Sequence, residues 1–125
     1  MVWMILTDTH IIVWLASGDK RLRVSAREQL FTASSLVVSA VIAWEYCDLQ
    51  LRGRLGNAPP FRDVAAQFYL DILPTPAEIW TVAEKLPAIH RDPVDRMLIA
   101  HALTIDATLA TADANIRRYP VKTLW

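Results

Sequence analysis

Short apolar runs alternate along the chain with longer segments in which apolar residues recur at helical spacing. The runs 3–7, 36–38, 72–74, 108–111 and 121–124 predict buried β-strands. The segments 11–15, 26–32, 40–52, 62–70, 75–86 and 93–105 predict helices. Apolar strands that alternate with helices are typical of a parallel sheet covered on both faces. The pattern therefore predicts an α/β fold in which about five parallel strands are flanked by helices on both faces.

Capping residues support several helix boundaries. Ser39 stands before the helix 40–52, and Asp92 stands before Pro93 at the first helical position. Ser25, with Glu28 three residues later, predicts a capping box.

Three residues on apolar helical segments are expected to be buried. They are Trp44, Cys47 and Trp80. Cys47 is read as a small buried hydrophobe rather than a reactive thiol.

Four acidic residues interrupt or border these apolar segments. Asp8 and Asp113 follow the first and fourth strands, whereas Glu45 and Asp95 lie on helices. Buried carboxylates are costly without a partner, and a shared divalent cation such as Mg²⁺ would relieve that cost. In α/β sheets ligands bind beyond the carboxyl ends of the strands, where Asp8 and Asp113 lie. The four acids together predict a metal site.

Each acid also has a purely structural explanation. Asp8 and Asp113 are suited to turns, and glutamate is a good helix former that usually faces water. The residues at helical spacing from Glu45, which share its side of the helix, are nevertheless mostly apolar. Asp92 is explained well as a helix N-cap. The negative charge of Asp95 stabilises the helix, because it lies near the N-terminus. Only the occurrence of all four acids favours the metal site.

Composition narrows the classes of function without selecting one. The 125 residues suit a single domain over 1–125, and a net charge of zero argues against a strongly basic nucleic-acid-binding surface. The single cysteine excludes an internal disulfide. We find no signal peptide and no apolar run long enough to cross a membrane, so a cytoplasmic protein without membrane contact is expected. The chain lacks the His-Glu-x-x-His motif of zinc enzymes, the Gly-x-Ser-x-Gly motif of serine hydrolases and the glycine-rich dinucleotide-binding motif.

Four segments carry a more specific signal when they are read together. They are 5–15, 38–45, 90–100 and 111–125. In this order they resemble PIN-domain proteins of the VapC toxin type over the whole chain. Two residues depart from the pattern: many relatives carry a serine at the position of Ile42, and some carry a further acid at the position of Asn115.

The resemblance implies an enzyme, a Mg²⁺- or Mn²⁺-dependent endoribonuclease that cleaves RNA phosphodiester bonds with metal-activated water. It also implies the toxin half of a bacterial toxin–antitoxin pair. The implied catalytic and metal-binding residues are Asp8, Glu45, Asp95 and Asp113, with Thr111, Arg96 and Asp92 as supporting residues. The implied partners are an RNA substrate of the tRNA or rRNA class, a cognate antitoxin and a second copy in a homodimer.

Ten of the 13 basic residues are arginines, which suit phosphate contacts. We hypothesise that Arg52, Arg54 and Arg91 bind the RNA backbone, with Arg96 also near the site. The helices near 27–32 and 62–70 are expected to offer a groove to an antitoxin helix.

Two alternatives remain at this stage. A phospho-acceptor receiver domain shares this length and strand pattern, but it needs an acidic pair after the first strand and a lysine after the last. Asp8 stands alone, and Lys122 lies inside the last predicted strand. The other alternative is a catalytically inert module that binds a partner, although all four acids are present.

Overall fold

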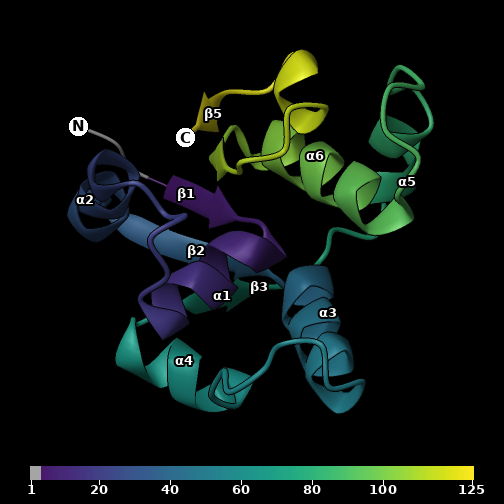
Figure 1. Ribbon diagram of the computed structural model, residues 1–125. Helices are drawn as coiled ribbons and strands as arrows, with labels where there is room; N and C mark the ends of the chain where they lie inside the picture. The colour runs from purple at the N-terminus through teal and green to yellow at the C-terminus, as the bar shows by residue number, and fades with distance from the viewer. Residues whose placement is uncertain (1–3) are drawn as a thin grey trace.

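Five parallel strands form one sheet in the order β3-β2-β1-β4-β5 (Figure 1). The computed structural model of the protein describes residues 4–125. The strands are β1 Met4–Thr7, β2 Ser35–Ser39, β3 Asp71–Leu73, β4 Thr108–Ala110 and β5 Thr123–Leu124. All four neighbouring pairs run parallel, as the apolar pattern predicts.

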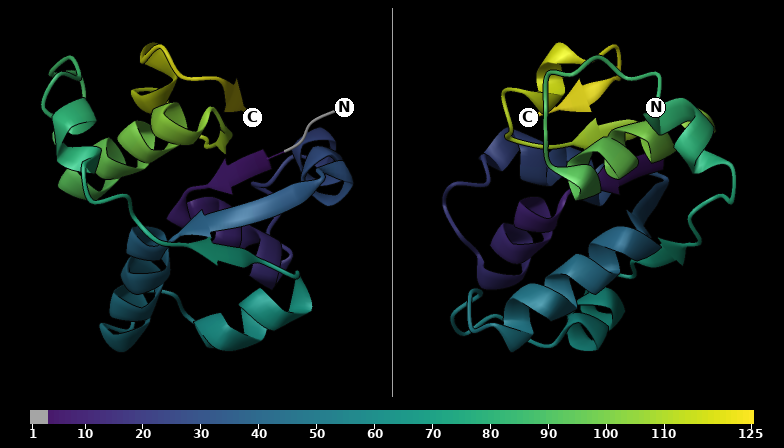
Figure 2. Two further views of the ribbon diagram at one scale, coloured as in Figure 1. Left: turned by 180° about the vertical axis from the view of Figure 1, so that it is seen from behind. Right: turned by 90° about the vertical axis from the view of Figure 1, so that its right-hand side faces the viewer.

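Helices connect the strands and cover the sheet (Figure 2). They are α1 Thr9–Ser17, α2 Val24–Thr32, α3 Ala40–Leu51, α4 Phe61–Gln67, α5 Ile79–Ala83, α6 Pro93–Ile105 and the 3₁₀ helix η1 Ile116–Arg118. Consecutive residues of β1 and β2 are buried, so both faces of these strands are covered. In the part of the chain that the structure describes, no helix has the length and apolar character needed to span a membrane.

The path of the chain reverses between β1 and β4. From β1 it proceeds outward to β2 and β3, and α5 and α6 then return it to β4 on the other side of β1. Strands β1 and β4 pair directly, with Leu6 beside Leu109. Such a reversal of strand order is the usual place for a ligand site in α/β sheets. A ligand site is therefore expected among the residues that follow β1 and β4.

Several predicted boundaries differ from the structure. The predicted capping box is wrong, because α2 begins at Val24 and Arg23 occupies the cap position without a side-chain bond. The predicted helix 75–86 is reduced to α5, and η1 was not predicted. The strand predicted over 3–7 is found from Met4, and Trp3 lies outside the described residues.

The prediction that Trp44, Cys47 and Trp80 are buried is also wrong. Cys47 is exposed, and the exposed fractions of Trp44 and Trp80 are 59% and 62%. Helix α3 is buried mainly through Ile42 and Tyr46, which lie one turn apart. Trp44 lies midway between them in sequence and therefore on the opposite side of the helix. An apolar segment of this length does not by itself reveal that only one side of the helix is covered.

Candidate metal centre

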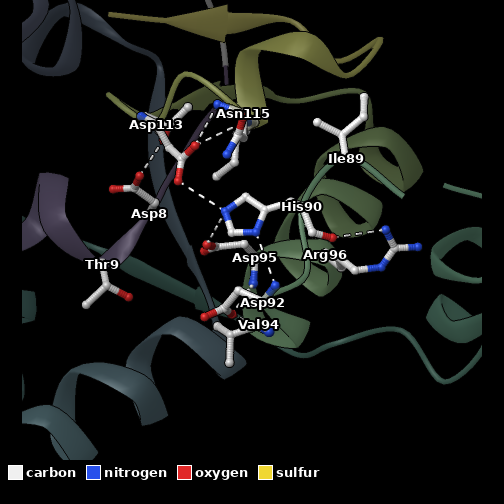
Figure 3. Close-up of polar contacts among 12 residues, drawn as sticks. Asp8, Thr9, Ile89, His90, Asp92, Val94, Asp95, Arg96, Asp113 and Asn115 are labelled. Carbon is white, nitrogen blue, oxygen red and sulfur yellow. Dashed lines mark hydrogen bonds and ion pairs between the residues drawn. The ribbon is translucent and has the colours of Figure 1, made fainter. Parts of the chain in front are cut away.

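A pocket of about 440 Å³ opens at the carboxyl ends of β1 and β4. Its lining residues are Asp8, Thr9, His10, Trp14, Glu45, Leu49, Asp92, Asp95, Ala112, Asp113 and Ile116. The structure thus brings the four acids of the predicted site to one pocket. The polar contacts around Asp95 and Asp113 are shown in Figure 3.

Asp8 is fixed at the end of β1 by two hydrogen bonds. Its Oδ1 accepts from the Ile11 amide over 2.9 Å, so Asp8 caps α1. Its Oδ2 accepts from the Thr111 hydroxyl over 2.5 Å. Burial raises the pKa of Asp8, while these two bonds act in the opposite direction. The turn role and a ligand role are compatible, because each carboxylate oxygen retains a further lone pair.

Glu45 reaches the same pocket from the second turn of α3. Its Oε1 accepts a hydrogen bond of 2.5 Å from the hydroxyl of Thr9, the residue after Asp8. This bond joins α3 to the start of α1. Glu45 is therefore turned inward and does not face solvent as an ordinary helix-surface glutamate would.

Asp92 and Asp95 have different roles at the start of α6. Asp92 Oδ1 accepts from the amides of Val94 and Asp95 over 2.9 and 3.1 Å, which makes it the helix cap. The Asp95 carboxyl instead extends into the pocket. Burial, repulsion from Asp92 and weaker repulsion from Glu45 and Asp8 outweigh attraction to His90 and raise the pKa of Asp95 to about 7. A bound cation would relieve this repulsion.

Asp113 lies in the loop between β4 and η1. Burial alone would raise the pKa of Asp113, but a hydrogen bond from His90 and backbone bonds from Ile116 and Asn115 outweigh it and lower the pKa. The two amides donate to Oδ1 over 3.2 and 2.7 Å. Asp113 is therefore held in its ionised form, which is the form that binds a cation.

His90 belongs to this centre, although it was not predicted from the sequence as a site residue. Its Nε2 lies 2.9 Å from Asp95 Oδ2 and 3.1 Å from Asp113 Oδ2 (Figure 3). These three atoms lie within 4.8 Å of one another. Its place at the start of the resembling segment 90–100 was the only signal in the sequence, and its spacing from Asp113 gave none.

The supporting and arginine residues divide into two groups. The Arg96 guanidinium donates to the carbonyls of Ala83, Leu86 and Pro87, with distances between 2.9 and 3.1 Å. Arg96 is thereby engaged within the protein, which supports a structural role and leaves it unsuited to the RNA backbone. Among the exposed arginines, Arg52 pairs with Asp48 over 3.1 Å, and Arg54 and Arg91 are also exposed.

The donor set fits a hard divalent cation. Carboxylate oxygens are the preferred ligands of Mg²⁺ and Mn²⁺. Carboxylate oxygens of Asp95 and Asp113 lie within 4.8 Å of each other. Asp8 and Glu45 line the same pocket but lie farther from this pair. The raised pKa of Asp95 is a second indication, because burial and repulsion from the neighbouring acids disfavour its ionised form and a bound cation would offset both effects.

Comparison with curated proteins gives one close parallel. The chain is 27% identical to ribonuclease VapC22 of Mycobacterium tuberculosis over 118 residues, which cover 92% of this chain and 91% of that protein.

Several solved structures share the fold. VapBC2 of Rickettsia felis, bound to a DNA fragment from its promoter, has a TM-score of 0.73 at 16% identity and covers 97% of each chain. VapC20 of Mycobacterium tuberculosis, a sarcin-ricin loop cleaving toxin, has a TM-score of 0.66 at 15% identity and covers 91% of this chain and 93% of its own. FitAB bound to a DNA fragment has a TM-score of 0.67 at 16% identity, with 97% and 94% covered.

The family model of the PIN domain matches residues 5–122. This span includes β1 from Ile5 onward, the strands β2 to β4 and all four acids of the predicted site. The match agrees with the resemblance found in the sequence and argues against a receiver domain. The chain therefore belongs to the PIN-domain family.

Proposed function

We propose that this protein is a metal-dependent endoribonuclease of the VapC type, the toxin of a toxin–antitoxin pair. The observation that carries the proposal is the convergence of four acids in one pocket of a PIN domain. They come from the residue after β1, from α3, from α6 and from the loop after β4, and they meet where the strand order reverses.

Asp8, Glu45, Asp95 and Asp113 would hold Mg²⁺ or Mn²⁺. When bound, such a cation lowers the pKa of water and offsets the charge that develops on phosphate. The protein contributes preorganisation, because Thr9, Thr111 and the helix amides already fix three of the acids. These three carboxylates therefore need not reorient when the substrate binds.

The substrate class is inferred to be tRNA or rRNA. Support comes from VapC20, which is described as cleaving the sarcin-ricin loop, an rRNA element. Arg52 and Arg54 follow α3, whose Glu45 and Leu49 line the pocket. Arg91 directly precedes Asp92, which also lines the pocket. We infer that these three arginines bind the phosphates of the strand, which positions RNA without reading its sequence. An RNA substrate is consistent with a cytoplasmic location.

A cognate antitoxin is inferred from the toxin complexes VapBC2 and FitAB. A groove of about 330 Å³ lies between α2 and α4, at the helices that the sequence pointed to. Phe31 and Phe68 line it with ring centroids 6.1 Å apart, and Tyr69 beside them is 87% exposed. Exposed aromatic side chains around a groove favour the apolar face of a partner helix.

A homodimer is inferred from large apolar side chains elsewhere on the surface. Trp44 and Leu51 on α3 and Trp80 on α5 are all exposed in the single chain. Tryptophan is enriched in protein interfaces. Light scattering during gel filtration measures the mass, and a single-chain mass would contradict the dimer.

The test of the enzymatic function is cleavage of bulk tRNA and rRNA by the purified protein with Mg²⁺, with Mn²⁺ and with chelator. Asp95→Asn should abolish cleavage. The matched control is Asp106→Asn, which changes an exposed acid at the other end of the same helix. We expect cleavage that depends on the cation and survives in the control. A folded protein that neither cleaves RNA nor binds Mn²⁺ would contradict the proposal and favour the inert partner-binding module.

A further inference from the structure

One imidazole N–H is shared between two acids that come from different elements. His90 Nε2 lies within hydrogen-bond distance of Asp95 on α6 and of Asp113 after β4 (Figure 3). Only 15% of the His90 side chain is exposed, and it does not line the pocket. The imidazole therefore braces the two acids from outside the pocket.

The hydrogen bonds of His90 identify its tautomer. Its Nδ1 accepts a hydrogen bond of 3.1 Å from the Asp92 amide, because a backbone N–H can only donate. The ring proton is then on Nε2, which donates to the two carboxylates. A protonated Nε2 has no lone pair for a metal, so the same contacts that bring His90 to the acids prevent it from being a ligand.

The backbone of His90 is held by a second polar group. The Tyr119 hydroxyl accepts from the amides of Ile89 and His90 over 3.2 and 2.8 Å and donates to the Pro87 carbonyl over 2.7 Å. Arg96 donates to the same Pro87 carbonyl and lies 3.3 Å from the hydroxyl. Tyr119 is 4% exposed. The Tyr119 hydroxyl thus holds the backbone of residues 87–90, and this backbone fixes the position of the His90 imidazole.

We propose that His90 is a positioning residue of the cation site, which acts through Asp95 and Asp113 and does not itself coordinate the metal. The inference rests on the cation site of the proposed function but does not require RNA to be the substrate. Each carboxylate oxygen has two lone pairs, so an oxygen that accepts from His90 can still bind a cation. Hydrogen bonds of this kind orient the ligating carboxylates, and their loss typically costs 10- to 100-fold in metal affinity.

Mn²⁺ binding to the metal-free protein, measured by calorimetry, tests the proposal without any cleavage assay. His90→Leu removes the donor and keeps an apolar side chain of moderate size, whereas His90→Gln keeps an N–H donor near the position of Nε2. We expect the affinity of the Leu variant to fall about 10- to 100-fold and the Gln variant to recover most of it. The control is Asp106→Asn, which changes an exposed acid outside the lining of the pocket and should leave the affinity unchanged.

A spectroscopic measurement on the unaltered protein separates positioning from ligation. Pulsed electron paramagnetic resonance of bound Mn²⁺ detects the nitrogen of a directly coordinated imidazole. We expect no such nitrogen coupling. Its presence would overturn the proposal, as would unchanged Mn²⁺ affinity in a folded Leu variant, or equal losses in the Leu and Gln variants.

A variant of Tyr119 keeps the proposal testable if His90→Leu fails to fold. Tyr119→Phe removes the hydroxyl that holds the His90 backbone and should lower Mn²⁺ affinity by a smaller factor. Unchanged affinity in that variant would contradict the bracing role of the loop. Absence of RNA cleavage together with the expected Mn²⁺ results would refute the RNA substrate and support the role of His90.

Discussion

The Thr111 hydroxyl donates a hydrogen bond of 2.5 Å to Asp8, which precedes it by 103 residues in the chain. The same hydroxyl accepts from the Asp113 amide over 3.1 Å. Thr111 is fully buried between the ends of β1 and β4. One side chain therefore fixes the two acids that follow these strands relative to each other.

Thr111→Val should impair both stability and cleavage. Valine has the same shape, but it leaves Oδ2 of the buried Asp8 carboxyl without its hydroxyl donor. Loss of a partner for a buried polar group costs about 1 to 3 kcal/mol in the free energy of unfolding. We expect this loss in chemical denaturation, together with a roughly tenfold lower rate of cleavage, because Asp8 is no longer oriented.

Thr111→Ser is the control for this prediction. Serine retains the hydroxyl and should retain most of the activity, with a small loss of stability from the missing methyl group. Equal activity of the Val and Ser variants would show that the hydroxyl does not orient Asp8.

Binding of the cation should release a proton near neutral pH. The pKa of Asp95 is raised to about 7 in the protein without metal, and the cation binds the ionised carboxylate. The apparent affinity for Mn²⁺ should therefore rise with pH up to about 7 and level off above it. Calorimetry at pH 6 in two buffers of different ionisation enthalpy measures the released proton. Equal binding enthalpies in the two buffers would contradict this prediction.

Asp95→Asn should stabilise the metal-free protein at pH 8 while it abolishes cleavage. Because the pKa of Asp95 lies above its ordinary value of 3.8, the folded state holds this proton more tightly than the unfolded chain does. The free energy of unfolding contributed by Asp95 is complete below pH 3.8 and is lost as the pH rises through about 7.

The size of this effect is limited by solvent. The full shift corresponds to about 4 kcal/mol, and screening at a side chain that is 22% exposed reduces it to about 1 to 2 kcal/mol. Urea denaturation of both proteins with chelator at pH 5 and pH 8 measures the difference. An unfolding free energy that falls equally with pH in both proteins would exclude Asp95 as the cause.

Reversing the charge of Arg52 and Arg54 together should weaken RNA binding. If each arginine contacts one phosphate, the slope of log affinity against log salt should decrease by about 1.4 for single-stranded RNA. The comparison is made in the Asp95→Asn background, so that RNA is bound without being cut. Arg27 and Lys122, which lie outside the lining of the pocket, serve as the matched double reversal. Unchanged binding at low salt would remove Arg52 and Arg54 from the RNA-binding surface.

The sequence predicted the residues that lie where local patterns end, and it failed where contacts are long-range. Asp8 and Asp113 follow apolar strands, so the parallel sheet itself brings them to one edge. The cap role of Asp92 was predicted correctly because capping has a local signature. His90 was missed because its partner Asp113 is 23 residues away, and no local pattern encodes that contact. The surface positions of Trp44 and Trp80 likewise depend on how α3 and α5 pack, which hydrophobicity along a helix does not determine.

The pairing of β1 with β4 has a consequence for the order in which activity appears during synthesis. Asp8 is made early. Its partner Thr111 and the acid Asp113 are added only after the strands β2 to β4 and the helices α1 to α6 have been translated. A growing chain therefore carries most of the acids without the arrangement that binds a cation. Nuclease activity should therefore arise in a single late step, when β4 inserts beside β1.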